Sequence, residues 1–365
     1  MTGTKNACFL ALAVLAGCKH PQIEQRPAPA DTGQEAEAAV DGGAELAEAS
    51  ASSQALSPDA AAAPEDEPLE RATSDELIDL TGLPHSAFIR SLFGPSPGHF
   101  NDGNAAIAHH DMTRRACLQG LRDLVIQSPA QRAVCGAENM VPIYRGGDMS
   151  AAKTCIDIFE FPNRACELPM VWGSPPQAKA ICEAQGKRLC AQSEWNLACA
   201  GDPDGGKDRV YAYGDVLDYS ICNTDKTHEL GDLTPWGTRT WQCHPQNAGT
   251  TWKTCSTDTE PTGAFPRCRS RFGVFDQHGN VAEIMSRKED GVTYTQLKGS
   301  AFFYIDVGRP HDAPPGPKMS GGQMHDTYPD GCTYDPRWHV EVLDHAKHSN
   351  YHLGFRCCKS LQKEQ

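Results

Sequence analysis

Apolar residues are distributed unevenly along this 365-residue chain. A short apolar run covers residues 7–16, residues 19–76 consist mainly of Ala, Glu, Pro, Asp, Ser and Gly, and large apolar side chains return from Leu77 onward. The middle segment offers too little apolar surface to offset the entropy that ordering it would cost. We therefore predict a disordered tether over 19–76 and a folded part that begins at residue 77.

Helical spacing and helix-boundary residues mark two parts of the folded region. Between residues 111 and 134 the apolar positions predict helix, and we assign an N-terminal helical layer to 77–138. The residues with this spacing are Met112, Cys117, Leu118, Leu121 and Leu124. Further on, Ser174 before Pro175 is typical of a helix start, and Gly186 is typical of a helix end.

The first eighteen residues have the pattern of a bacterial lipoprotein signal. Lys5 provides positive charge, the apolar run is too short to span a bilayer, and Leu15-Ala16-Gly17-Cys18 has the small residues and the cysteine of a lipobox. We predict that 1–18 is a signal segment and that Cys18 becomes the lipidated N-terminus, with Lys19 favouring delivery to the outer membrane. The alternative is an ordinary signal peptide or an apolar N-terminal helix.

Charge is concentrated in the predicted tether. The formal net charge of the chain is −14, and residues 19–76 carry −11 of it, with fourteen carboxylates against three basic side chains. The rest of the chain is close to neutral, which argues against a nucleic-acid groove or a surface for anionic lipids. Because the sequence contains no apolar run long enough to span a bilayer, we expect contact with a membrane through the lipid anchor only.

Sixteen cysteines are present, and fourteen remain after Cys8 in the signal and Cys18 at the lipid site are set aside. An even number of cysteines in an exported chain indicates disulfides, and up to seven are possible here. The sequence contains no Cys-x-x-Cys pair, which a zinc site would favour. The adjacent Cys357 and Cys358 are expected to pair with two different partners.

Several short motifs follow one another in a fixed order through the last three fifths of the chain. They are Met140-Val141-Pro142-Ile143, Ile156-Asp157-Ile158-Phe159-Glu160 with Asn163, Gly186-Lys187-Arg188-Leu189 with Ser193-Glu194-Trp195, Tyr213-Gly214-Asp215 with Asn223, Gly279-Asn280-Val281-Ala282-Glu283, Gly299-Ser300 and Gly354-Phe355-Arg356-Cys357. In this order they resemble the motifs of formylglycine-generating-enzyme (sulfatase-modifying factor) domains. The resemblance covers residues 139–360 and implies an α+β fold, a variant of the C-type lectin fold, with little regular secondary structure and many disulfides.

The resemblance also implies two long-range disulfides, each of which would stabilise the fold by several kcal/mol because it closes a long loop. These are Cys182–Cys357 and Cys199–Cys332. For the other cysteines, short separation along the chain favours two local bridges. These are Cys155–Cys166 and Cys243–Cys255.

Formylglycine-generating enzymes oxidise a substrate cysteine with oxygen through two cysteines that bind copper(I), and the resemblance places that pair after Gly299-Ser300. The two positions hold Phe303 and Gly308 in this chain. A soft monovalent metal favours thiolate ligands, so we expect neither copper nor a catalytic residue there. The exception would be a site rebuilt from Cys332 and another residue of the segment 309–335.

The same resemblance implies calcium in the turn that contains the Gly-Asn-Val-Ala-Glu motif. The ligands would be the carbonyl oxygens of Gly279 and Val281 and the carboxylate of Glu283, because Ca²⁺ takes oxygen ligands and a glycine lets the chain curl around the ion. A second family calcium site would include Asn223. Both tryptophans that the family has in this loop are replaced, so the alternative is a turn without metal.

Two further features have a structural and a functional interpretation. A second branch of the superfamily, the non-haem iron sulfoxide synthases, uses histidine ligands. The spacing of His345, His348 and His352 would put such ligands on one side of a short helix, but we favour a solvated loop. Glu194 and Trp195 are expected to serve a helix start and the core, where the indole NH needs one partner.

These observations predict a lipid-anchored domain that binds or scaffolds rather than catalyses, with an unidentified protein or glycan as its partner. The insertions at 225–260 and 309–340 are the expected binding face, because loops tolerate changes of length and carry recognition. Aromatic residues in or next to them either bind or pack the insertions: Trp236, Trp241, Trp252, Tyr304, Tyr328 and Trp338. The alternatives are an oxidase that acts on a thiol substrate through a rearranged metal site, and a purely structural envelope protein.

Overall fold

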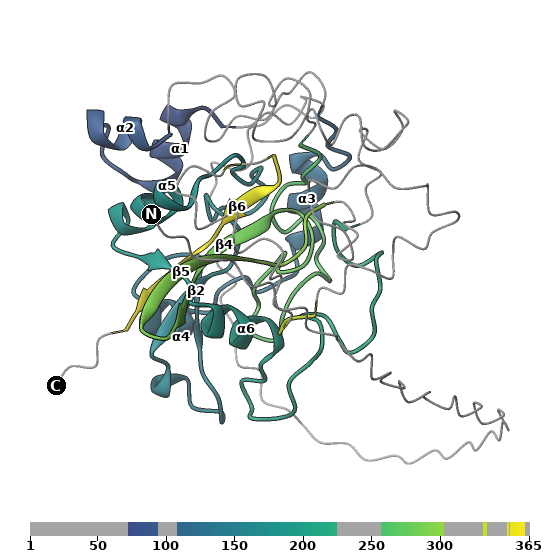
Figure 1. The fold of residues 1–365 in the computed structure, drawn as a ribbon. Coiled ribbons are helices and arrows are strands. Elements are labelled where there is room, and N and C mark those ends of the chain that lie inside the picture. The colour runs from purple at the N-terminus through teal and green to yellow at the C-terminus, as the bar shows by residue number, and fades with distance from the viewer. Residues whose placement is uncertain are drawn as a thin grey trace, which may run out of the picture. The chain divides into compact units, whose positions relative to one another are not determined.

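The computed structural model describes residues 72–93, 108–224, 257–302, 331–333, 349 and 351–361. In these residues the helices are α1 (Ser74–Thr81), α2 (Ala87–Phe93), α3 (Arg114–Leu121), α4 (Pro129–Cys135), the short 3-10 helix η2 (Met149–Ala151), α5 (Pro175–Ala184) and α6 (Gln192–Ala200). The strands are β1 (Met140–Ile143), β2 (Thr154–Asp157), β3 (Arg188–Leu189), β4 (Ala282–Glu289), β5 (Val292–Lys298), β6 (Leu353–Phe355) and β7 (Cys357–Ser360). The predicted α+β class with little regular secondary structure is confirmed (Figure 1).

Two small sheets meet near the C-terminus of the chain. One has the strand order β1-β2-β7-β3 and the other the order β5-β4-β6. β7 pairs antiparallel with β2 and β3. β6 pairs in parallel with β4 (Figure 1). Only Arg356 separates β6 from β7, so this residue lies where the chain passes from one sheet to the other.

Capping residues fix where the N-terminal helices begin. Thr73 and Glu76 form a capping box at the start of α1, so α1 begins inside the segment that the sequence assigns to the tether, and the predicted boundary is corrected to residue 73. Ser128 and Gln131 form a second capping box at α4. This box divides the predicted helical segment 111–134 into α3 and α4.

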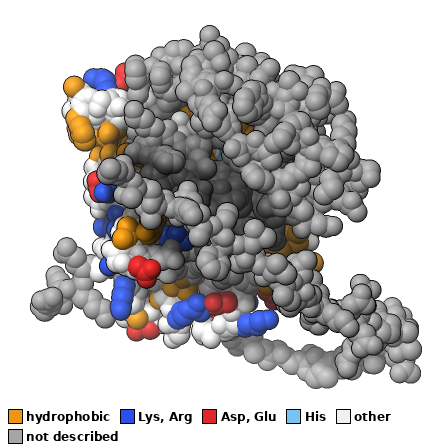
Figure 2. All heavy atoms as spheres, in the orientation of Figure 1, with side chains coloured by type: hydrophobic (Ala, Val, Ile, Leu, Met, Phe, Trp, Pro, Cys, Tyr) orange, Lys and Arg blue, Asp and Glu red, His pale blue; other side chains and the backbone are white. Residues whose placement is uncertain are grey.

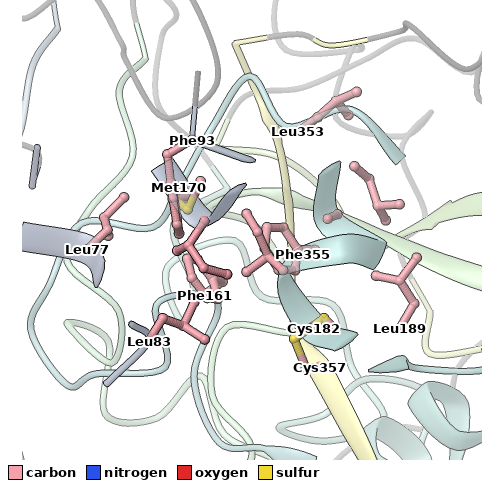
Figure 3. Close-up of a cluster of buried hydrophobic side chains, with 14 of the residues drawn as sticks. Leu77, Leu83, Phe93, Phe161, Met170, Cys182, Leu189, Leu353, Phe355 and Cys357 are labelled. Atoms are coloured by element: carbon pink, nitrogen blue, oxygen red, sulfur yellow. A yellow bond between two sulfur atoms is a disulfide. The ribbon is translucent and has the colours of Figure 1, made fainter. Parts of the chain in front are cut away.

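The N-terminal helices pack in separate places. α1 and α2 lie with α5 on one cluster of buried apolar residues, in which Phe161 stacks on Phe93 and Phe355 with ring centroids 6.4 and 4.7 Å apart (Figure 3). α3 contributes Leu121 to a second cluster that contains Phe275. α4 contributes Cys135 to a third cluster with Met140 and Cys155, so the helices of the predicted N-terminal layer pack on different parts of the domain.

All twelve cysteines in the described residues are paired, and they form six disulfides. The pairs are Cys117–Cys166, Cys135–Cys155, Cys182–Cys357, Cys190–Cys358, Cys199–Cys332 and Cys222–Cys268. Two of them, Cys182–Cys357 and Cys199–Cys332, are those that the family resemblance implies. The adjacent cysteines 357 and 358 do take different partners.

The predicted local bridge Cys155–Cys166 is wrong. Cys155 on β2 bonds to Cys135 at the end of α4, because α4 packs beside β1 and β1 pairs with β2. Cys166 instead bonds to Cys117 in α3. The other predicted local bridge, Cys243–Cys255, lies outside the described residues.

The described surface carries charges of both signs. In the view of Figure 2, Lys and Arg side chains alternate with Asp and Glu side chains along the lower part of the molecule, without a field of one sign. This agrees with the near-neutral charge of the chain beyond the acidic segment. None of the helices in the described ranges has the length and apolar composition needed to cross a membrane.

Candidate functional site

The turn that precedes β4 brings distant parts of the chain together. Asp276, Gly279 and Asn280 all have left-handed backbone conformations, with φ of 56°, 75° and 60°. A Cβ atom on Gly279 would lie 2.1 Å from the carbonyl oxygen of Asn223, so only glycine allows this close approach. The turn therefore holds Asn223 directly against the Gly279-Asn280 backbone.

The structure brings the predicted calcium ligands into one region. The main-chain NH of Asn280 donates to the carbonyl oxygen of Asn223 at 2.9 Å, and the Asn223 side chain donates to Oδ1 of Asn280 at 3.0 Å. The main-chain NH of Val281 donates to Oε1 of Glu160 at 3.0 Å. Gly279 donates its NH to the hydroxyl of Ser300 at 2.8 Å.

Glu283, the expected carboxylate ligand, has other partners. Arg356 donates from Nη2 to Oε1 of Glu283 at 2.6 Å and from Nε to Oε2 at 2.7 Å. The indole NH of Trp195 donates to Oε2 at 2.9 Å. A guanidinium that already binds both oxygens of a carboxylate repels a second cation beside them. Glu283, in this position, therefore does not fit the predicted role of a calcium ligand. The interpretation of Trp195 as a core residue with one NH partner is confirmed.

Two more buried carboxylates, Glu160 and Asp276, lie close to this ion pair. Burial raises the pKa of Glu160 well above its ordinary value, and the charges of Asp276 and Glu283 raise it further. Burial also raises the pKa of Asp276, to about 7, although an NH from Gly263 at 2.7 Å opposes the shift. The raised pKa values favour the protonated forms of these two groups, which lowers the negative charge that Arg356 has to balance.

Two other acidic residues of the motifs, Asp157 and Glu194, accept hydrogen bonds that stabilise the fold around the turn. Asp157 accepts from the ammonium of Lys187 at 2.7 Å and from the main-chain NH of Cys357 at 3.0 Å, so three separate motifs meet at one carboxylate. Glu194 accepts from the main-chain NH of Ala191 at 2.8 Å, which serves the start of α6 as expected. This interaction compensates for the missing side-chain cap at residue 191.

The residues that precede the family's copper-binding positions in the sequence lie next to this turn. Gly299 and Ser300 follow β5, and Phe302 donates its main-chain NH to the carbonyl oxygen of Asn280 at 3.0 Å. Both Ser300 and Phe302 are buried. Phe303 and Gly308, which the family resemblance assigns to the two cysteine positions, lie outside the described residues.

Both insertions leave the described fold at the same turn. Asn223, at the start of the first insertion, also donates to the carbonyl oxygen of Asp258 at its end, at 3.4 Å. Glu260 donates its main-chain NH to Oδ1 of Asn280 at 2.7 Å. Phe302, the last described residue before the second insertion, bonds to the same Asn280. Their aromatic residues lie outside the described ranges.

Sequence reasoning missed one histidine of this region. His278, which is 2% exposed, places Nε2 3.5 Å from Sγ of Cys199 and 3.8 Å from Sγ of Cys332. No local pattern marks His278, because the two cysteines reach it only through the tertiary fold. His352, expected in a solvated loop, is instead buried, while His345 lies outside the described residues.

Comparisons with known proteins agree with this architecture. Residues 151–361 match the family described as the Sulfatase-modifying factor enzyme 1-like domain, FGE-sulfatase. Because the match spans more than half of the chain, the protein belongs to this family. No curated protein matches the sequence.

Two solved structures show low overall similarity to this chain. The crystal structure of CarF has a TM-score of 0.32 and 12% sequence identity, and the match covers 61% of this chain and 97% of CarF. PvdO from Pseudomonas aeruginosa has a TM-score of 0.27 and 16% identity, with 64% of this chain and 75% of PvdO covered.

Proposed function

We propose that this chain is a lipid-anchored, non-catalytic binding or scaffolding module of the cell envelope, built on the sulfatase-modifying factor fold. Cys18 would carry the lipid, and the acidic segment 19–76 would tether the domain to the outer membrane. The six disulfides suit an oxidising compartment outside the cytoplasm. An unidentified protein or glycan would be the partner.

The observation that carries the proposal is that the described cysteines are all in disulfides, so none is available as a thiolate ligand for copper(I). Phe303 and Gly308 replace the pair that would bind copper(I), and neither a phenyl ring nor a hydrogen atom can ligate a metal. The twelve described cysteines are all in disulfides. Among the remaining cysteines, only Cys243 and Cys255 belong to the expected mature domain, and they are predicted to pair with each other.

The position of the insertions supports binding at the former catalytic face. The described residues Asn223 and Phe302, which precede the segments 225–260 and 309–340, both bond to Asn280. They supply aromatic side chains, the residue class that dominates recognition hot spots. Intact family motifs in the rest of the domain are consistent with a binding surface in place of a catalytic site.

Binding is tested by affinity capture with the full chain, using Trp236→Ala and Trp338→Ala in parallel. The proposal predicts a reproducible partner whose capture falls at least tenfold in one of these variants. Phe88→Ala, which changes a side chain that is 64% exposed on α2, serves as the control and should leave capture unchanged. Equal capture by all three variants would contradict binding through the insertions.

Anchoring needs a separate experiment. Metabolic labelling with a fatty acid should mark the wild-type chain and leave Cys18→Ser unlabelled, and the wild type should fractionate with the outer membrane. An unlabelled wild-type chain would contradict the anchor while leaving the binding proposal standing.

A second candidate function is an oxidase of a thiol substrate through a rearranged metal site. The observation that favours it is the grouping of Cys199, Cys332 and His278, whose potential ligand atoms lie within 4.8 Å of one another. In the oxidised protein the two sulfurs are bonded to each other, so the oxidase would require this disulfide to open. Oxygen consumption with a cysteine-containing peptide distinguishes this candidate from the binding module.

A further inference from the structure

His278 lies against one disulfide of the six. Its Nε2 atom is within 3.8 Å of both sulfurs of Cys199–Cys332, and all three residues are buried. Within the described part of the chain, this is the only group of three or more His, Cys, Asp or Glu side chains close enough to share a metal ion. The three residues come from α6, from the turn before β4 and from the segment 331–333.

Nε2 of His278 carries a lone pair rather than a proton, and in the oxidised protein this lone pair accepts a main-chain hydrogen bond. The main-chain NH of Ala212 donates to Nε2 of His278 at 2.9 Å, so Nε2 is an acceptor and the neutral ring carries its hydrogen on Nδ1. The rings of Tyr211 and Tyr213 lie on either edge, with centroids 5.7 and 5.5 Å from that of His278. This is the tautomer that a metal-binding histidine requires, held in place by packing.

A positive charge lies beside the same disulfide. The ammonium of Lys298 donates to the carbonyl oxygen of Cys332 at 3.0 Å and lies 5.1 Å from the ring centroid of Trp195. A neighbouring cation favours a thiolate over a thiol. Once this disulfide opened, Lys298 would therefore favour the thiolate form of Cys332.

Another described disulfide, Cys117–Cys166, has a different setting. Sγ of Cys117 lies 3.7 Å from the carbonyl oxygen of Thr262, and a carbonyl cannot complete a soft ligand set. Cys182–Cys357 lies among apolar side chains of the cluster in Figure 3. The imidazole is what distinguishes Cys199–Cys332.

We propose that Cys199, Cys332 and His278 form a redox-gated site for a thiophilic closed-shell cation. A dithiol reductant supplies two electrons and two protons, the S–S bond breaks into two thiols, and the reductant becomes a disulfide. One cation then binds both sulfurs and Nε2 of His278, with release of the two thiol protons and loss of the Ala212 hydrogen bond. Two cysteines and a histidine are a known donor set for Zn²⁺ with an open fourth position, and thiolates also suit Cu⁺.

This proposal goes beyond the binding function, because a cation can hold the reduced form together without any catalysis. In the oxidised protein the cluster binds no cation, since both sulfurs are used in the bond between them. The site would therefore make the stability of the domain respond to metal only under reducing conditions.

The test uses the full chain, opened with graded amounts of a phosphine reductant. The phosphine is removed before the cation is added, because it is itself a soft ligand for Cu⁺. Isotope-coded alkylation with peptide mass analysis then reports each cysteine. We expect a range of reductant in which Cys199 and Cys332 are labelled before Cys182 and Cys357. One equivalent of Zn²⁺ or Cu⁺, tested separately, should then slow labelling of the first pair at least tenfold and leave the second pair unchanged.

The matched variants are His278→Gln and His85→Gln. Glutamine at 278 keeps an acceptor for the Ala212 amide, while His85 is an exposed residue near α1. We expect His278→Gln to weaken cation binding roughly tenfold or more and His85→Gln to leave it unchanged. Equal protection in both variants would overturn the proposal, as would protection by neither cation.

A spectroscopic measurement on the unmodified chain keeps the test independent of how well a variant folds. Co²⁺ added to the partly reduced protein should produce thiolate-to-metal absorption that Zn²⁺ abolishes. Absence of this absorption would contradict a thiolate site. Simultaneous labelling of all twelve described cysteines at the first effective reductant concentration would also overturn the proposal, because the disulfide would then open only on unfolding.

Discussion

Arg356 binds Glu283 in a bidentate ion pair inside the protein, with N···O distances of 2.7 and 2.6 Å. Each of the two side chains is 1% exposed. The same guanidinium also donates to the main-chain carbonyls of Asp157, Ile158 and Phe275. Arg356 thus uses its donors to connect both sheets with the turn before β4.

Removing this guanidinium is expected to destabilise the domain strongly. Arg356→Met leaves Glu283 buried without a cation, which typically costs roughly 3–5 kcal/mol. Urea unfolding with the disulfides intact measures the change. Arg145→Met removes an exposed pair with Asp208 and should cost less than about 1 kcal/mol. Equal losses in the two variants would show that the buried pair is not what holds the junction.

The stability of the domain should fall as pH rises from about 4 to about 7. Over this range folded Asp276, whose pKa burial raises to about 7, keeps a proton that the unfolded chain has lost. A single such group contributes a slope of about 1.4 kcal/mol per pH unit. Asp276→Asn keeps an acceptor for the Gly263 amide and should flatten this part of the profile.

The control for the pH profile is Asp208→Asn. The hydrogen bond from Arg145 lowers the pKa of exposed Asp208, so that carboxylate contributes stability above its unfolded pKa and loses it only as pH falls below about 4. The slope between pH 4 and 7 should therefore persist in Asp208→Asn. An unchanged slope in Asp276→Asn would contradict a protonated Asp276 in the folded protein.

Gly279→Ala should destabilise the domain more than Gly82→Ala. Both glycines have positive φ, but a Cβ at Gly279 would lie 2.1 Å from the carbonyl oxygen of Asn223, while a Cβ at Gly82 meets nothing within 4 Å. Gly82→Ala is expected to cost about 1 kcal/mol for the left-handed conformation, and Gly279→Ala roughly 2 kcal/mol more for overpacking. Thermal unfolding of the two variants compares them directly.

Calcium removal is expected to leave the unfolding temperature unchanged. Arg356 holds both oxygens of Glu283, so this carboxylate already has a cationic partner. Thermal unfolding with and without a calcium-selective chelator measures this, with Mg²⁺ addition as the control. A fall on chelation that Ca²⁺ restores and Mg²⁺ does not would show that Glu283 leaves Arg356 for a metal.

The sequence predicted the framework well because its motifs are local and ordered. The Ser174-Pro175 helix start, the role of Glu194 at the start of α6 and the split partners of Cys357 and Cys358 all depend on short patterns or on family order. The division of 111–134 at Ser128 could have been predicted too, because Ser-Pro with a glutamine three residues later is a capping signal.

The candidate site was less accessible to sequence reasoning. The Arg356–Glu283 pair joins residues 73 positions apart. Neither the motif with Glu283 nor the motif with Arg356 indicates by itself that these two side chains form a pair. His278 meets Cys199 across 79 positions. Short separation also misled the pairing of Cys155, because the packing of α4 beside β1 determined its partner.

The most direct test of the non-catalytic account is copper loading of the native, mature protein, followed by metal analysis, thiol titration and oxygen uptake with a cysteine-containing peptide. The account predicts no free thiol, no stoichiometric Cu⁺ and no oxygen consumption above the protein-free control. One copper per chain together with conversion of the peptide thiol to an aldehyde would contradict it.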